Sequence, residues 1–93
     1  MRYPRPLTAQ ERAWLDAAIA SVPSPRRERL AVQAATVRVH WLCGCGQCHT
    51  MDLIDADDSR APVVCVATVP AGDGREVFLH VDADDRLAEL EVV

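Results

Sequence analysis

The residues with the greatest chemical potential lie between positions 40 and 49. Three cysteines and two histidines fall within these ten positions, namely His40, Cys43, Cys45, Cys48 and His49. Thiolate sulfur and imidazole nitrogen are the ligands that structural zinc prefers, and zinc takes four of them in a tetrahedron. Glycines between the cysteines give the backbone the freedom to wrap an ion. The spacing therefore predicts a zinc site with Cys43, Cys45, Cys48 and His49 as its ligands.

The fourth ligand of this zinc site has two further candidates, His40 and Cys65. Zinc ribbons pair two Cys-x-x-Cys knuckles, whereas this chain contains one such knuckle, Cys45 to Cys48, and a distant Cys65. The start of the sequence carries no apolar export signal, which favours thiols or metal ligands over a disulfide framework. The zinc hypothesis therefore depends on three clustered cysteines and one of three candidates for the last position.

Three other interpretations of the cysteine cluster stay open. Cys45-Gly46-Gln47-Cys48 resembles the Cys-Gly-Pro-Cys of thioredoxins, but a strand is expected after it, where a redox site needs a helix N-terminus to lower the thiol pKa. Residues 45–49 also fit the Cys-x-x-Cys-His haem motif, although haem attachment follows export and a second axial ligand is hard to place. Alternatively, the cysteines are reduced and pack as small apolar residues, with Cys65 in the core.

No catalytic constellation emerges from the rest of the chain. His80 alternates with apolar neighbours, so it should lie on the solvent face of a strand, and Ser59 falls in an expected turn. A Cys–His nucleophile pair would need a third group to orient it, and none can be named. We therefore predict an accessory or binding protein rather than an enzyme, with a thiol-redox protein using Cys45 and Cys48 as the alternative.

The elements that position the cluster divide the chain near residue 35. Thr8-Ala9-Gln10-Glu11 forms a capping box at the start of a helix over residues 7–22. Ser24 as N-cap and Pro25 at the first helical position start a second helix over residues 24–35. Apolar residues recur at helical spacing in the first helix: Leu15, Ala18, Ile19 and Val22.

Residues 36–93 predict a β-meander. Four or five strands are expected, at residues 37–43, 50–55, 63–69, 76–82 and 87–93. The strand over 63–69 is apolar on both faces, which predicts a central position. Short connections favour antiparallel neighbours. The whole chain of 93 residues is therefore expected to form one α+β domain, with both helices on one face of a mainly antiparallel sheet.

The two tryptophans are expected to share the single core. Trp14 flanks the apolar stripe of the first helix, and Trp41 shares the apolar face of the first strand with Val37 and Val39. The alternative is that Trp41 lies exposed beside the cysteine turn and anchors a partner, as interface hot spots do.

Composition restricts the classes of partner. Fourteen acidic residues against ten arginines give a net charge of −4, which disfavours nucleic acid as a partner. No apolar run reaches the ~20 residues of a membrane span, so a cytoplasmic protein is expected. Two acid-rich repeats, 54–58 and 81–85, lack the glycine and glutamate of a calcium loop, so they predict turns. An unidentified protein partner is compatible with this surface, and Val92 and Val93 on an edge strand could pair with a second copy.

The chain also resembles a group of small actinobacterial proteins with no established activity. The resemblance is carried by Cys43-Gly44-Cys45-Gly46, Cys48, the run Thr50-Met51-Asp52-Leu53 and an ending like Leu79 to Val92, together with Gln33 and Val37 and an N-terminal Leu-x-x-x-Glu-Arg helix. Trp41 stands where that group would carry another cysteine. The resemblance implies the fold over most of the chain and does not imply a function.

Overall fold

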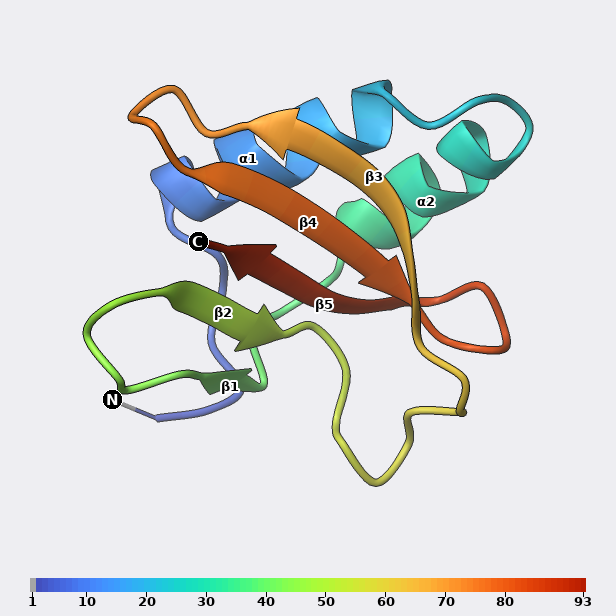
Figure 1. The fold of residues 1–93 in the computed structure, drawn as a ribbon. Coiled ribbons are helices and arrows are strands. Elements are labelled where there is room, and N and C mark those ends of the chain that lie inside the picture. The colour runs from blue at the N-terminus through green and yellow to red at the C-terminus, as the bar shows by residue number, and fades with distance from the viewer. Residues whose placement is uncertain (1) are drawn as a thin grey trace.

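The computed structural model describes residues 2–93, which form two helices and a five-stranded sheet. The elements are α1 (Ala9–Ala20), α2 (Arg26–Ala34), β1 (Trp41–Leu42), β2 (His49–Asp52), β3 (Val64–Pro70), β4 (Glu76–Val81) and β5 (Leu87–Val92). The two helices contact each other, α1 contacts β3 and β4, and α2 contacts β5 (Figure 1). The α+β fold with both helices on one face of the sheet is confirmed.

The sheet has the strand order β1-β2-β5-β4-β3, and every neighbouring pair is antiparallel. The prediction that β3 is central was wrong, because β3 lies at an edge and β5 lies in the middle (Figure 1). The chain also departs from a simple meander, since β2 pairs with β5. Val92 pairs with His49 on one side and Val77 on the other, so it is not on an edge strand open to a second copy.

The capping box at the start of α1 is confirmed, although the helix runs from Ala9 to Ala20 and is two residues shorter at each end than the predicted range 7–22. The Thr8 hydroxyl accepts a hydrogen bond from the Glu11 backbone N–H at 3.1 Å, and the Glu11 carboxylate accepts one from the Thr8 N–H at 2.9 Å. This capping box uses only residues three apart, so the local sequence is enough to specify it. The apolar stripe is also confirmed, because all four of its members are buried: Leu15, Ala18, Ile19 and Val22.

Helix α2 begins two residues later than predicted. The Ser24 hydroxyl bonds to the Glu28 carboxylate at 2.5 Å and does not cap the backbone, and Pro25 occupies the N-cap position. The helix packs through Leu30 and Ala34, which are both buried. The nine-residue helix α2 therefore contacts the core through one face only.

The core lies between the helices and the inner face of the sheet. Trp14, at 8% exposure, belongs to it as predicted, whereas Trp41 is 50% exposed. The expected alternation fails because Val39 bridges to Arg5, while Trp41 pairs with Asp52 of β2. The two residues thus belong to different ladders, and Trp41 faces away from the helices. The sheet contributes these buried residues: Met51, Ala67, Val77, Leu79, Val81, Leu87, Ala88, Leu90 and Val92.

Cys65 is exposed on the edge strand β3, so the prediction of a core position for it was wrong.

The second acid-rich repeat, residues 81–85, contains a turn, as predicted. Its buried Asp82 carboxylate accepts hydrogen bonds from the backbone N–H groups of Asp84 and Arg86, both at 3.0 Å.

Candidate metal centre at the cysteine turn

The connection between β1 and β2 brings three thiols together. Cys43 lies one residue past β1, and its N–H donates to the Thr50 carbonyl at 2.8 Å, which extends the ladder to the base of the turn. Cys48 lies one residue before β2. The Sγ atoms of Cys43, Cys45 and Cys48 all lie within 4.8 Å of one another. These three residues are thus close enough to coordinate one metal ion.

The turn backbone directs the sulfurs toward one another. Gly46 has φ +79°, a left-handed conformation that side-chain-bearing residues rarely adopt. The next residue, Gln47, directs its N–H to the Cys45 Sγ at 3.4 Å, and the Thr50 hydroxyl lies 3.5 Å from the Cys48 Sγ. A β-carbon added at Gly46 would meet nothing within 4 Å, so backbone conformation and not space requires the glycine.

The electrostatics of the turn favour a thiolate at Cys45. Hydrogen bonds from the Gln47 N–H and from the Cys48 side chain lower the pKa of Cys45 to about 6. The pKa of Cys43 is raised instead: the Cys45 backbone N–H lowers it, but the Cys45 and Cys48 side chains outweigh that effect. The cluster therefore concentrates one negative charge on an exposed sulfur, and an incoming cation would allow the other two thiols to ionise.

The separation of Cys45 and Cys48 is compatible with a shared ion. Their Sγ atoms are 3.2 Å apart. Two sulfurs that each lie about 2.3 Å from a tetrahedral zinc are separated by roughly 3.8 Å. A disulfide requires about 2.05 Å. Zinc therefore needs an opening of roughly 0.6 Å, and a disulfide a closing of roughly 1.1 Å.

None of the three candidates for the fourth ligand, His49, His40 and Cys65, joins the group of thiols in the structure. The Nε2 of His49 lies 2.6 Å from the Glu11 carboxylate, beneath the helix. Cys65 is on β3, at the opposite edge of the sheet from the turn. His40 lies just before β1 and lines a separate cavity with Trp41 and Asp52. Among the residues described, the thiol cluster thus supplies three ligands.

His49 has a structural role that the sequence analysis missed. The Glu11 carboxylate is 1% exposed and accepts hydrogen bonds from two Arg5 nitrogens at 2.6 and 2.8 Å, besides those from Thr8 and His49. Burial raises the pKa of Glu11, but the bonds from Arg5, Thr8 and His49 outweigh it and lower the pKa to about 2. The His49 ring also meets the Trp14 ring edge-on at 5.2 Å. His49, the residue after Cys48, therefore contacts α1 through Glu11 and Trp14.

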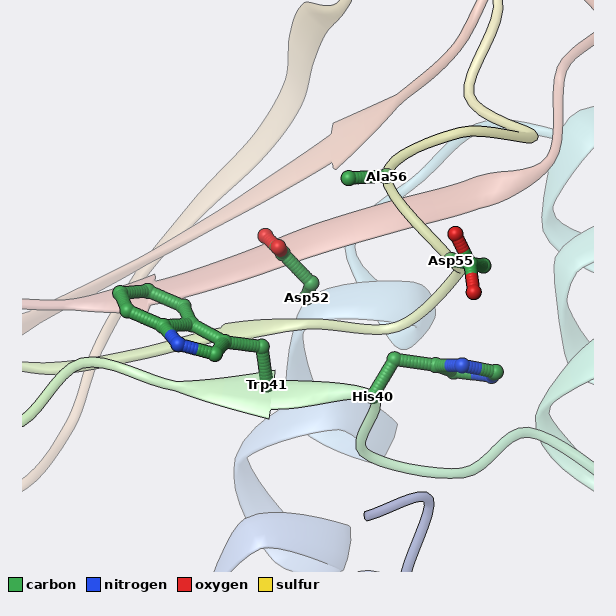
Figure 2. A pocket seen from close by; sticks show the side chains of 5 residues that line it. All are labelled: His40, Trp41, Asp52, Asp55 and Ala56. Atoms are coloured by element: carbon green, nitrogen blue, oxygen red, sulfur yellow. The ribbon is translucent and has the colours of Figure 1, made fainter.

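The exposed Trp41 borders a cavity of about 470 Å³ at the end of the β1–β2 pair away from the cysteine turn. His40, Asp52, Asp55 and Ala56 complete its lining. Figure 2 shows Trp41 and Asp52 on neighbouring strands, with Asp55 and Ala56 in the segment after β2. Trp41 and Asp52 thus lie on the sheet face that the helices leave uncovered, and Asp55 lies in the loop after β2.

No protein-family model, curated protein or solved structure matches this chain. The resemblance to small actinobacterial proteins with a Cys-Gly-Cys turn therefore remains a prediction based on its motif residues. Within residues 2–93, neither helix has the length and apolar character needed to cross a membrane.

Proposed function

We propose that this chain is a small accessory protein whose cysteine turn binds one zinc ion through the thiolates of Cys43, Cys45 and Cys48. The observation that carries the proposal is the convergence of three Sγ atoms within 4.8 Å on one short turn. Thiolate ligands select softer metals, and tetrahedral thiolate sites are typical of zinc. The low pKa of Cys45 supports the proposal, because a ligand that is already ionised lowers the cost of metal binding.

An ion held by three thiolates keeps its fourth position for another ligand. Structural zinc sites are closed by four protein ligands, whereas sites that exchange or react keep one position open. The bond to Glu11 keeps Nε2 of His49 out of that position. A water molecule or a donor from a partner protein would complete the tetrahedron. The 50% exposed Trp41, two residues before Cys43, offers an apolar anchor for such a partner.

Cobalt substitution tests the thiolate ligation directly. Co²⁺ bound to thiolates gives an intense charge-transfer absorption, which histidine and carboxylate ligands do not produce. We expect this absorption in the wild-type protein at one Co²⁺ per chain, and its displacement by one equivalent of Zn²⁺. Cys43→Ser, Cys45→Ser and Cys48→Ser should each weaken Zn²⁺ binding at least tenfold in competition with a chromogenic chelator.

Cys65→Ser is the matched control, because it removes an exposed thiol at the opposite edge of the sheet. It should leave both the absorption and the zinc affinity unchanged. Native mass spectrometry should show one bound zinc that a chelator removes. The zinc proposal fails if wild-type protein gives no thiolate absorption with Co²⁺, or if Cys65→Ser weakens binding as much as the turn variants do.

A thiol-redox role is the second candidate, and the Cys45 pKa of about 6 favours it. In this reaction the Cys45 thiolate attacks a substrate disulfide, forms a mixed disulfide and releases one substrate thiolate. Cys48 then attacks the Cys45 sulfur, closes the Cys45–Cys48 disulfide and releases the second thiol. The substrate is reduced by two electrons, and the protein dithiol is oxidised by the same two.

Alkylation kinetics separate this second candidate from the first. If Cys45 is the attacking thiol, its alkylation rate in the metal-free protein should rise with a midpoint near pH 6, and Cys48→Ser should trap the mixed disulfide. Mass spectrometry after digestion assigns the modified residue. A midpoint at the ordinary thiol value of ~8.5 would end the redox hypothesis.

A further inference from the structure

The sheet face opposite the helices carries a row of side chains that the zinc proposal does not use. Strand register sets the row, with each member paired to the next across neighbouring strands: Trp41, Asp52, Glu89, His80 and Cys65. Glu91 lies two residues further along β5, so it projects from the same face as Glu89. An aromatic ring, three carboxylates, an imidazole and a thiol thus share one open surface.

His80, Glu89 and Glu91 form a group with metal-ligand spacing within this face. Their ligand atoms all lie within 4.8 Å of one another, and all three side chains are half-buried. The Nδ1 of His80 is 3.7 Å from a Glu89 carboxylate oxygen, too long for a hydrogen bond. Nitrogen and oxygen ligands about 2.1 Å from a tetrahedral ion are separated by roughly 3.4 Å. The observed 3.7 Å is about 0.3 Å wider than this separation, so the two groups would need to close by that amount around an ion.

The imidazole nitrogen that faces this gap lacks a partner. Nδ1 of His80 is inaccessible to solvent and has no hydrogen-bond partner among residues 2–93. Buried polar atoms are ordinarily bonded, so each exception needs an explanation. A coordinated ion would satisfy this nitrogen and a Glu89 oxygen at the same time.

The charges around the group are also out of balance. No arginine of residues 2–93 forms an ion pair with Asp52, Glu89 or Glu91. Asp52, Glu89 and Glu91 therefore have no arginine as counter-charge, and a bound cation would supply one.

We propose that His80, Glu89 and Glu91 bind a divalent transition-metal ion on the open face of the sheet, at a site distinct from the cysteine turn. Nitrogen and oxygen ligands select harder ions than thiolates do, so the two sites are expected to differ in metal preference. Mn²⁺ suits the nitrogen and oxygen ligands of the His80 site and binds poorly to the thiolates of the cysteine turn. Asp52, cross-strand from Glu89, adds negative charge beside the ion.

Paramagnetic broadening in NMR locates the ion in the wild-type chain. Mn²⁺ added at substoichiometric amounts should broaden the amide signals of residues 78–81 and 88–92 first. The signals of residues 43–48 and of the acid-rich turn at 82–85 should broaden later. Broadening that begins in the acid-rich turn, or spreads evenly over exposed carboxylates, would overturn the proposal.

Substitution then tests the individual ligands. His80→Gln and Glu91→Gln should each weaken Mn²⁺ binding at least tenfold, measured by the electron paramagnetic resonance signal of free Mn²⁺. His40→Gln and Asp84→Asn are matched controls outside the group and should leave the affinity within twofold. Circular dichroism checks that each variant is folded, and two independent ligand variants keep the test decisive if one of them is not.

This result is independent of the zinc proposal. The His80 site gives no thiolate absorption with Co²⁺, so loss of that absorption in the cysteine variants leaves the Mn²⁺ measurement unaffected. If both His80→Gln and Glu91→Gln fold and retain wild-type Mn²⁺ affinity, the site proposed on the open face does not exist.

Discussion

The two faces of the sheet differ in whether their charged side chains have hydrogen-bond partners. On the helix-covered side, the one buried acid of α1 is Glu11, and Arg5, Thr8 and His49 satisfy its oxygens. On the open side, His80 and Glu89 stand 3.7 Å apart without a bond, and no arginine of the described chain pairs with the carboxylates there. Structural charges come with their partners, so an incomplete set marks the face where a ligand is expected.

Removing Glu11 should cause the largest loss of stability in this comparison. Glu11→Ala leaves Arg5 and His49 without their shared acceptor and abolishes the capping box, so we expect a loss of about 3–5 kcal/mol of unfolding free energy. Urea denaturation measures it. Asp16→Ala, an exposed acid in the same helix, is the control and should leave the midpoint nearly unchanged. Equal effects of the two substitutions would show that the Glu11 network does not stabilise the fold.

The tryptophans provide a matched pair across the two faces. Trp14 is 8% exposed in the core and Trp41 is 50% exposed on the open face. Trp14→Ala should cost about 3–5 kcal/mol. Trp41→Ala should change stability by about 0.5 kcal/mol or less. If Trp41→Ala lowers the urea midpoint as much as Trp14→Ala does, the assignment of Trp41 to the uncovered face is wrong.

The helical half was predictable because its determinants are local. The capping box of α1 spans four residues, and its apolar stripe follows from the helix period. The β half was less predictable, because pairing depends on residues far apart. Nothing within residues 63–69 indicates that β2 inserts beside β5 and leaves β3 at the edge. Because the apolar residues on both faces of β3 do not report its pairing partners, they led to the wrong prediction of a central place in the sheet.

The candidate sites show the same division. The three cysteines were predicted as a group because they share one turn, and the structure brings them together. The role of His49 was missed because its partner Glu11 lies 38 residues away. The pairing of His80 with Glu89 depends on a register shift between His80 and Val81, because the turn pairs Val81 with Leu87 and would otherwise place His80 opposite Ala88. From the strand period alone, His80 was expected on the solvent face without a partner.

Acid should weaken the helix-covered face through Glu11. The pKa of Glu11 is about 2 in the folded protein, below the ~4.3 of an unfolded glutamate. Its contribution is therefore complete above pH ~4.3 and is lost as the pH falls toward 2, for a total of about 3 kcal/mol. Urea denaturation between pH 2 and pH 6 should show this loss in the wild-type protein and a smaller slope in Glu11→Gln. Parallel curves for the two proteins would contradict the low pKa.

The smallest expected effect is a gain of stability on the open face. The pKa of Asp52 is raised in the folded protein by burial, which outweighs the charge of His40. A raised carboxyl pKa means that the folded state binds the proton more tightly than the unfolded state. Stability due to this group is therefore present below the unfolded pKa and is lost as the pH rises through the folded pKa.

At neutral pH, Asp52→Asn should remove this unfavourable charge and raise stability by less than about 1 kcal/mol, because partial exposure screens it. The gain should vanish below pH ~4, where Asp52 is protonated in both states. Glu76→Gln, an exposed acid on β4, is the control and should show no such pH-dependent gain. A loss of stability in Asp52→Asn at pH 7 would mean that Asp52 has a cationic partner, and the open face would then be satisfied in the same way as the Glu11 network.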